Sequence, residues 1–298
     1  MTIIINLSFI ISLLCVRMVT PLTPRIRKAA ESDEMIMACK FIKQPVIRKC
    51  RKVTSFEGMP NGSTIPIEIG LLTSLTKLSI YKSNGAISGG EGGTIPSTIG
   101  KLTALKYLSL KGYDIVGSIP SNIRKLTALT YLDISGNQVK GNIPSSITRL
   151  TKLQHLGLYL NALTGTIPAG IGNLSKLTSL LLYENNLTGS LPATLGQLTA
   201  LTSLVAQQNN IMGSIPSTIG QLTGLEYLDI SENTFKGKIP SSIVKLTKLQ
   251  SLTLGGNALS GSIPSNIGQL SALQSLNLDR NNLKGHIPSS MGKLTNLV

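Results

Sequence analysis

Residues 129–150 read LTYLDISGNQVKGNIPSSITRL, and residues 153–174 repeat the same spacing as LQHLGLYLNALTGTIPAGIGNL. A proline that follows Ile or Leu returns every 24 residues without a slip. These prolines are Pro96, Pro120, Pro144, Pro168, Pro192, Pro216, Pro240, Pro264 and Pro288. A fixed period of this length indicates one small unit stacked along an axis, because a single unit cannot bury its own apolar face.

Each unit contains a short strand signal followed by a turn signal. Leu129, Leu132 and Ile134 alternate with polar residues, which is typical of a strand with one buried face. Stacked copies of this strand would pair as a parallel sheet. Pro144 has no N–H to lose at the start of a helix, so the segment after it is predicted to form a short helical turn. Glycines at the end of this segment are expected to terminate the turn, and they are Gly172, Gly196, Gly220 and Gly268.

An asparagine column accompanies the strands. An amide side chain both donates and accepts hydrogen bonds, so it can satisfy backbone groups where the chain turns inward. We predict this structural role for Asn137, Asn161, Asn185, Asn209, Asn233, Asn257 and Asn281.

The general pattern LxxLxLxxNxLxGxIPxxIGxLxx resembles the leucine-rich repeat of the plant-type, 24-residue subclass, over roughly residues 63–298. The resemblance implies an α/β repeat solenoid of about nine to ten repeats. In that fold a curved right-handed superhelix carries a parallel sheet on its concave face and short 3-10 or helical turns on its convex face. The interval from Pro66 to Pro96 is six residues longer than the others, and we assign the excess to a loop at 88–93. No capping unit for the C-terminal end is recognisable within 63–298.

The first 62 residues follow a different pattern. An apolar run at 3–16 is typical of a secretory signal, so residues 1–22 are predicted to be a signal peptide, with a membrane anchor or neither as the alternatives. Residues 23–62 are basic and are expected to form a degenerate N-terminal cap. In a secreted chain Cys39 and Cys50 could form a disulfide. The triplets that begin at Asn61, Asn173 and Asn186 match the glycosylation acceptor pattern.

The net charge of +15 favours acidic partners, such as an acidic polysaccharide or an acidic protein. One column of the convex turns is rich in basic residues, namely Lys101, Lys125, Arg149, Lys245 and Lys293. Neither a nucleic-acid-binding motif nor a basic and aromatic strip is present, so nucleic acid is not an expected partner.

Catalysis is not expected either. The chain has two histidines, His155 and His286, which lie more than five repeats apart and cannot share a metal ion or a nucleophile. Serine-hydrolase, phosphate-loop and zinc-protease motifs are lacking. We therefore expect no enzyme activity, no cofactor and no metal site.

Residues between the core leucines are predicted to point to the concave face, where their identities are free to specify a ligand. Tyrosine suits recognition because it joins a large apolar area to a hydrogen-bonding tip. We expect an exposed patch of aromatic, aliphatic and acidic side chains there. It consists of Tyr107, Tyr131, His155, Tyr159, Leu160, Leu181, Tyr183, Glu184, Val205, Tyr227 and Asp229.

The leading hypothesis is an extracellular recognition module that binds a protein or peptide on its concave face. The resemblance implies either a receptor ectodomain, with a co-receptor or a longer membrane-attached form, or a secreted inhibitor of a cell-wall hydrolase. One alternative is an ice-binding or stress protein that uses a repeated hydroxyl column, although those hydroxyls are expected to bond nearby backbone. The column is Thr103, Thr127, Thr151, Ser175, Thr199, Thr223, Thr247, Ser271 and Thr295. Another alternative is an intracellular repeat scaffold.

Overall fold

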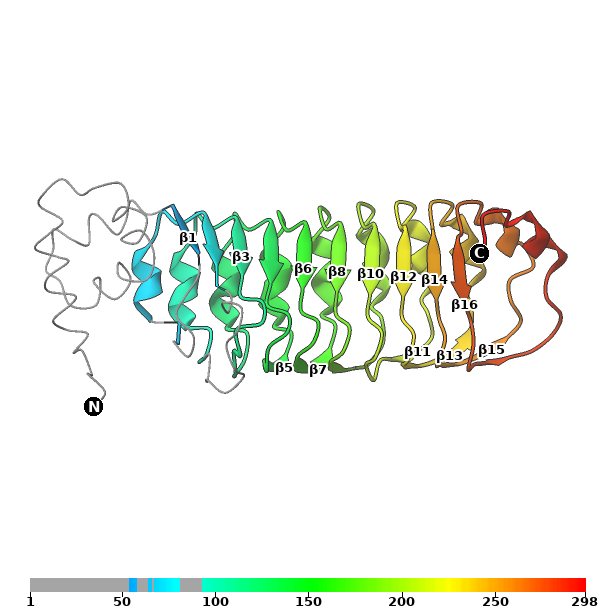
Figure 1. The fold of residues 1–298 in the computed structure, drawn as a ribbon, viewed down its shortest axis with the longest axis horizontal. Coiled ribbons are helices and arrows are strands. Elements are labelled where there is room, and N and C mark those ends of the chain that lie inside the picture. Colours follow the sequence, from blue (N-terminus) through cyan, green and yellow to red (C-terminus); the bar gives the residue numbers. More distant parts are fainter. Residues whose placement is uncertain (1–53, 58–63, 66, 81–92) are drawn as a thin grey trace, which may run out of the picture.

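The computed structural model describes residues 54–57, 64–65, 67–80 and 93–298, and these form a solenoid (Figure 1). Each turn adds one strand to a parallel sheet of ten strands. In spatial order the strands are β1 (Ser55–Glu57), β2 (Lys77–Ser79), β3 (Tyr107–Ser109), β4 (Tyr131–Asp133), β6 (His155–Gly157), β8 (Ser179–Leu181), β10 (Ser203–Val205), β12 (Tyr227–Asp229), β14 (Ser251–Thr253) and β16 (Ser275–Asn277). The predicted fold class is confirmed.

The sheet register follows the sequence period. Leu132 of β4 lies opposite Leu156 of β6, which is a shift of 24 residues. Leu78 of β2 lies opposite Leu108 of β3, a shift of 30 residues, so the six extra residues lie between these two strands. The predicted loop at 88–93 falls outside the described residues except for Gly93. Strand β1, which pairs with β2, lies within the segment expected to be a cap.

The convex side is built from short 3-10 turns. They are η1 (Ile67–Leu71), η2 (Ser97–Lys101), η3 (Ser121–Lys125), η4 (Ser145–Arg149), η5 (Ala169–Asn173), η6 (Ala193–Gln197), η7 (Ser217–Gln221), η8 (Ser241–Lys245), η9 (Ile267–Gln269) and η10 (Ser289–Lys293). Pro144 precedes η4 with φ −66° and ψ 132°, and its carbonyl accepts the N–H of Ile147. The fixed φ of proline therefore prepares the first turn, as the sequence predicts.

The predicted role of the turn glycines is wrong. Gly172 lies inside η5 and does not have a left-handed backbone conformation. A Cβ atom at Gly172 would overlap the backbone oxygen of Thr194 in the next turn, so glycine is needed there for close stacking. The left-handed glycines form a different column, with Gly165 at φ 71° and Gly237 at φ 81°.

That second glycine column belongs to two further parallel sheets, which the sequence analysis missed. One sheet consists of β5 (Lys140–Asn142), β7 (Ala162–Thr166) and β9 (Asn186–Thr188). The other consists of β11 (Met212–Gly213), β13 (Thr234–Lys238), β15 (Ala258–Gly261) and β17 (Asn282–Leu283). The signal that could have revealed them is the glycine three residues before each proline, such as Gly165 before Pro168.

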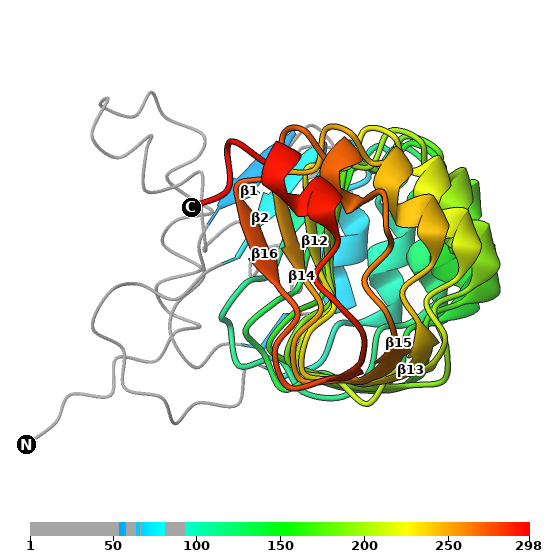
Figure 2. The ribbon, with the colours of Figure 1, turned by 90° about the vertical axis from the view of Figure 1, so that its right-hand side faces the viewer.

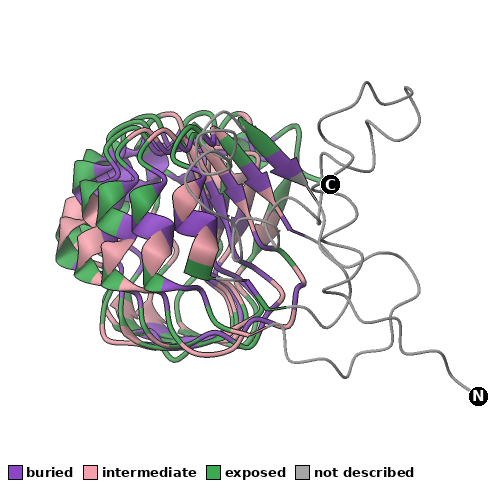
Figure 3. Ribbon diagram, turned by 90° about the vertical axis from the view of Figure 1, so that its left-hand side faces the viewer, coloured by how far each residue is buried: buried purple, intermediate pink, exposed green. Residues whose placement is uncertain are grey.

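The core lies between the ten-stranded sheet and the 3-10 turns. The middle residue of most strands is fully or almost fully buried, as are the leucines on both sides of each turn. Figure 3 shows the buried residues inside the coil and the exposed residues on the outer side of the turns. Figure 2 shows the first and last turns displaced to the strand side of the middle turns, so the sheet lines the inside of the curve.

Neighbouring turns are also joined by hydroxyl groups on the convex side. Ser146 Oγ donates to the carbonyl of Ser121 at 3.0 Å, and Thr218 Oγ1 donates to the carbonyl of Ala193 at 2.8 Å. In η5 the equivalent position is Gly170, which has no hydroxyl to donate to the carbonyl of Ser145. That carbonyl instead accepts a hydrogen bond from Oγ1 of Thr148, at 2.8 Å.

We expect the effects of substitutions at Gly170 and Thr148 to be coupled. Gly170→Ser alone should destabilise the protein, because a Cβ atom at Gly170 lies 3.1–3.3 Å from three side-chain atoms of Thr148. Combined with Thr148→Gly, the new hydroxyl can reach the carbonyl of Ser145. A double-mutant cycle in urea should give a favourable coupling of about 0.5–1.5 kcal/mol. Additive effects of the two substitutions would contradict this account.

Candidate functional site: the strand face

The outer surface of the ten-stranded sheet is the candidate site, and we call it the strand face. In each strand the middle residue points into the core, whereas the first and third residues point outward. In β8, for example, Leu180 is fully buried while Ser179 and Leu181 are partly exposed. Residues one turn apart are direct neighbours on this face, because the strands are paired in register.

An aromatic stack crosses the first repeats of the strand face. The rings of Tyr107 and Tyr131 are stacked with centroids 4.4 Å apart, and the rings of Tyr131 and His155 are stacked at the same spacing. The ammonium group of Lys77 lies 5.4 Å from the centroid of Tyr107, so a cation covers that end of the stack. All three rings are partly exposed, which leaves their edges available for contact.

A second stack lies beside the first. The rings of Tyr159 and Tyr183 have centroids 4.4 Å apart, and the ammonium group of Lys111 lies 5.4 Å from the centroid of Tyr159. Tyr159 is only 9% exposed, so the expectation that it is an exposed patch residue is wrong. The reason is that Tyr183 covers one face of its ring and Lys111 lies over the ring as well. The pKa of Lys111 is raised, chiefly by its side-chain interaction with Tyr159. Tyr183 itself remains partly exposed.

Asp133 is a buried carboxylate beside the first stack, 4% exposed. Its Oδ1 accepts hydrogen bonds from the N–H of Ser135 at 2.9 Å and the hydroxyl of Ser135 at 2.5 Å. The hydroxyl of Tyr131 lies 3.4 Å from its Oδ2. Burial, with a contribution from Asp133, raises the pKa of Tyr131. The sequence signal for this arrangement is the motif Tyr-Leu-Asp-Ile-Ser, which occurs at 131–135 and again at 227–231.

His155 lies at the end of the first stack in a partly desolvated position. Its Nε2 is buried and has no hydrogen-bond partner among the described residues. Burial lowers the pKa of His155, against the opposing influence of Asp133. The folded protein therefore holds this imidazole in its neutral form more strongly than the unfolded chain does.

We expect acidification to destabilise the protein partly through His155. The unfolded chain takes up the proton near the ordinary histidine pKa of about 6.5, whereas the folded state takes it up only at lower pH. Between these two values the unfolded state binds more protons, so stability falls as the pH falls through that window. Urea unfolding at a series of pH values should show a smaller loss for His155→Gln than for the unsubstituted protein. His286→Gln, at an exposed position, is the control. An equal loss in all three proteins would contradict this expectation.

Small and apolar side chains occupy the middle of the strand face. Leu181 and Val205 are paired neighbours and are both partly exposed. Beside them, Ser179 and Ser203 replace the ring-bearing residues of the flanking strands. Tyr227 follows on β12 and is 47% exposed. The result is a low shelf of two repeats between His155 and Tyr227, in which two small serines lie beside two aliphatic side chains. We define this shelf as Ser179, Leu181, Ser203 and Val205.

Leu160 and Glu184 are exposed but lie apart from the strand residues. Each has a left-handed backbone, with φ 53° and 51°. Both line an open depression of about 530 Å³ below the strand ends, together with Gln138, Lys140 and Ala162. Of the predicted patch, the structure therefore brings together the strand residues and Tyr183, and it places Leu160 and Glu184 at the rim. Asp229 lies on β12 next to Val205.

The asparagine column connects neighbouring turns. Asn185 Oδ1 accepts the N–H of Leu163 at 3.0 Å, while its Nδ2 donates to the carbonyl of Leu158 at 3.0 Å. Two weaker bonds go to carbonyls of its own turn. The same pattern recurs at Asn137, Asn161, Asn209, Asn233, Asn257 and Asn281. These side chains link neighbouring turns through hydrogen bonds to the backbone, as the sequence analysis expects.

The hydroxyl column of the ice-binding alternative differs from expectation. Thr127, Thr151 and Thr223 are exposed, and their hydroxyls donate no hydrogen bond to the backbone of the described residues. The expectation that these hydroxyls bond nearby backbone is wrong. The hydroxyls that donate to backbone carbonyls of the preceding turn belong to a different column, which contains Ser146 and Thr218. A row of free hydroxyls therefore runs along one side of the solenoid.

Several predicted features lie outside the described residues, namely the signal peptide at 1–22, Cys39, Cys50 and Asn61. Asn173 and Asn186 are both exposed, at the end of η5 and the start of β9. Within the described ranges, no group of His, Cys, Asp and Glu side chains could hold a metal ion. Among the described residues, the helical segments lack the length and hydrophobicity that a membrane-spanning helix requires.

Comparison with known proteins places this geometry in a family. A family profile described as "Leucine-rich repeat region" matches residues 89–212 and 206–298. No curated protein matches the chain. The structure of the plant peptide hormone receptor RGFR1 in complex with RGF2 is similar, with 35% identity and a TM-score of 0.77 over 85% of this chain and 40% of that one.

Two other solved structures are informative. The Arabidopsis receptor kinase HAESA, in complex with the peptide hormone IDA and the co-receptor SERK1, is 32% identical, with a TM-score of 0.67 over 83% of this chain and 45% of that one. A plant ice-binding protein is 31% identical, with a TM-score of 0.62 over 68% of this chain and 65% of that one. The chain thus spans less than half the length of the two receptors. By profile, repeat geometry and structural similarity, the chain is of the plant type and belongs to the leucine-rich repeat family.

Proposed function

We propose that the chain is an extracellular recognition module that binds a protein or peptide through the strand face. The observation that carries this proposal is the row of partly exposed aromatic rings beside a shelf with the aliphatic residues Leu181 and Val205, on a sheet that holds its side chains in fixed register. An exposed apolar surface of this kind is typical of interaction sites. Two similar proteins were solved with peptide hormones bound, which supports the same class of ligand here.

The wider context of the proposal is a receptor ectodomain. The HAESA structure includes a co-receptor, so a co-receptor and a longer, membrane-attached form of this chain are part of the proposal. A secreted inhibitor of a hydrolase would use the same strand face. The exposed lysines of the convex turns, such as Lys101 and Lys125, could hold the molecule on an acidic polysaccharide. We also propose glycans at the exposed residues Asn173 and Asn186.

The test is affinity capture from extracellular extract with matched variants. Tyr183→Ala combined with Tyr227→Ala should weaken binding of the retained partner by about 2–4 kcal/mol in total, because large rings are removed from the contact surface. The fold should stay intact, since both rings are partly or largely exposed. Tyr159 is unsuitable for this test because it is buried. Gln221→Ala, at an exposed position on the convex turn η7, is the control. A partner whose binding is changed by Gln221→Ala and not by the tyrosine pair would place the site elsewhere.

Ice binding is the second candidate function, and the free hydroxyls of the convex column favour it. The similarity to a plant ice-binding protein adds support. Replacing Thr127, Thr151 and Thr223 by Lys should abolish inhibition of ice recrystallisation if this column acts on ice. Activity that is absent from the start, or unchanged by the substitutions, removes this candidate.

A further inference from the structure

Charges on the strand face are separated along the axis of the solenoid. Lys106 and Lys111 flank β3 near the N-terminal end, and both are exposed. Between residues 177 and 235 the chain contains four Glu or Asp and no Lys or Arg. Three of these carboxylates flank or lie on β12, at Glu226, Asp229 and Glu232. The strand face is therefore basic around β3 and acidic around β12, with the shelf between.

The side chain of Lys111 extends along the strand face in the direction of the shelf. Lys111 follows β3, yet its ammonium group lies over the ring of Tyr159, two turns further along. The intervening residue of this column is Ser135, which is small and fully buried and leaves the path open. The positive charge of Lys111 therefore lies next to the ring of Tyr159, which follows β6.

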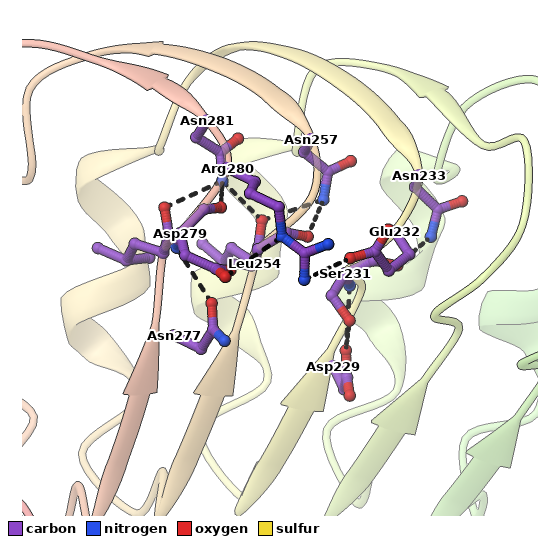
Figure 4. Close-up of polar contacts among 12 residues, drawn as sticks. Asp229, Ser231, Glu232, Asn233, Leu254, Asn257, Asn277, Asp279, Arg280 and Asn281 are labelled. Carbon is purple, nitrogen blue, oxygen red and sulfur yellow. Dashed lines mark hydrogen bonds and ion pairs between the residues drawn. The ribbon is translucent and has the colours of Figure 1, made fainter.

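At the acidic end, Asp229 presents an oxygen that has no partner. Its Oδ1 accepts hydrogen bonds from the N–H and the hydroxyl of Ser231, at 3.0 and 2.6 Å (Figure 4). No described residue bonds to its Oδ2. Glu232, by contrast, is paired with Arg280 at 3.1 Å, as Figure 4 shows. The carboxylate of Asp229 is thus held in place by two hydrogen bonds and still has an oxygen free for a cation.

The spacing between the two charges suits a short extended chain. From β6 to β12 there are three strand spacings, through β8 and β10, which amounts to about 14 Å. An extended peptide rises about 3.3 Å per residue, so about four residues cover this distance. The shelf of small and aliphatic side chains lies directly between and could accept a ring or an aliphatic side chain of the ligand.

We propose that the strand face binds a short, extended peptide segment with opposite charges at its two ends. An acidic group of the segment meets Lys111, a basic side chain about four residues away meets Asp229, and an apolar side chain between them lies on the shelf. This inference rests on the proposed function and adds the charge pattern and the orientation of the ligand. A uniformly acidic polymer does not fit the same surface, because Asp229 would repel it.

The test is selection of short random peptides displayed on phage against the immobilised protein. Wild-type protein should enrich peptides in which an acidic and a basic residue are separated by about four positions. Lys111→Gln should lose the preference for the acidic residue, and Asp229→Asn the preference for the basic one. Asp229→Asn keeps an oxygen that can accept both bonds from Ser231, so the local structure is retained. Convex-side controls with the same changes in charge are Lys125→Gln and Glu68→Gln.

Binding of one enriched peptide should then be measured directly. Each strand-face substitution should weaken it about threefold to tenfold, and added salt should reduce the affinity for wild-type protein. Asp229→Lys should select peptides with an acidic residue where the wild type selects a basic one. That reversal is an outcome that simple loss of folding cannot produce.

Failure of this inference differs from failure of the proposed function. Enriched peptides without the charge pattern, or with a pattern that Lys111→Gln and Asp229→Asn leave unchanged, overturn the inference. If those peptides still depend on Tyr183 and Tyr227, the strand face remains the binding surface. A selection that enriches no peptide also overturns the inference, and the capture experiment then decides the proposed function separately.

Discussion

Asn209→Ala should destabilise the protein by about 2–6 kcal/mol, since unsatisfied buried polar groups cost about 1–3 kcal/mol each. Asn209 is 7% exposed, and its Oδ1 accepts the N–H of Leu187 at 2.9 Å. Its Nδ2 donates to the carbonyls of Leu182, Ala206 and Gln207 at 3.1–3.3 Å. Alanine leaves several of these groups unpaired in an interior that water cannot reach easily.

The adjacent residue provides the control for this prediction. Asn210 is exposed, and its side chain makes no hydrogen bond with the described residues. Asn210→Ala should therefore change stability by less than about 0.5 kcal/mol. Urea unfolding followed by circular dichroism would measure both variants. Similar losses at Asn209 and Asn210 would mean that the asparagine column does not carry the stacking of the turns.

Leu156→Ala should destabilise the protein by about 2–5 kcal/mol, because it opens a cavity in a core shared by neighbouring turns. Leu156 is the middle residue of β6 and is 1% exposed. It is paired with Leu132 and Leu180 of the adjacent strands, which cannot move inward without breaking the sheet register. The void therefore remains largely unfilled.

Leu160→Ala, four residues away in the same repeat, is the matched control. The side chain of Leu160 is 42% exposed, so its removal should have little effect on stability. Thermal or urea unfolding of both variants measures the difference. A small loss for Leu156→Ala would show that the turns can close around a cavity, contrary to the tight stacking described above.

Much of the fold follows from the sequence because every turn repeats one pattern. The 24-residue interval predicts the register of the sheet, and the proline before each turn predicts where the 3-10 segment begins. The structural role of Gly172 could not be predicted from the repeat pattern. Glycine at the end of a turn is typical of a left-handed cap, whereas here it allows close contact with Thr194 in the next turn, which only three-dimensional stacking reveals.

The candidate site was predictable in location and less so in detail. Alignment of the 24-residue repeats identifies which side chains share the strand face, and it places Tyr131 beside His155. It does not show how far a long side chain extends, and Lys111 crosses two turns to cover Tyr159. The burial of Tyr159 depends on that crossing. The second motif with Asp229 was visible in the sequence, but the free oxygen of its carboxylate was not.

The two Tyr-Leu-Asp-Ile-Ser strands begin at Tyr131 and Tyr227, which are 96 residues or four whole turns apart. Unequal recombination between gene segments that encode such copies would delete or duplicate complete turns and leave the pairing of every remaining strand unchanged. Each gained or lost turn would alter the length of the strand face by about 4.8 Å. Descendants of such an event would keep a foldable chain while the span between their charged ends changed in discrete steps. The length of the strand face is therefore a property that can change by whole turns.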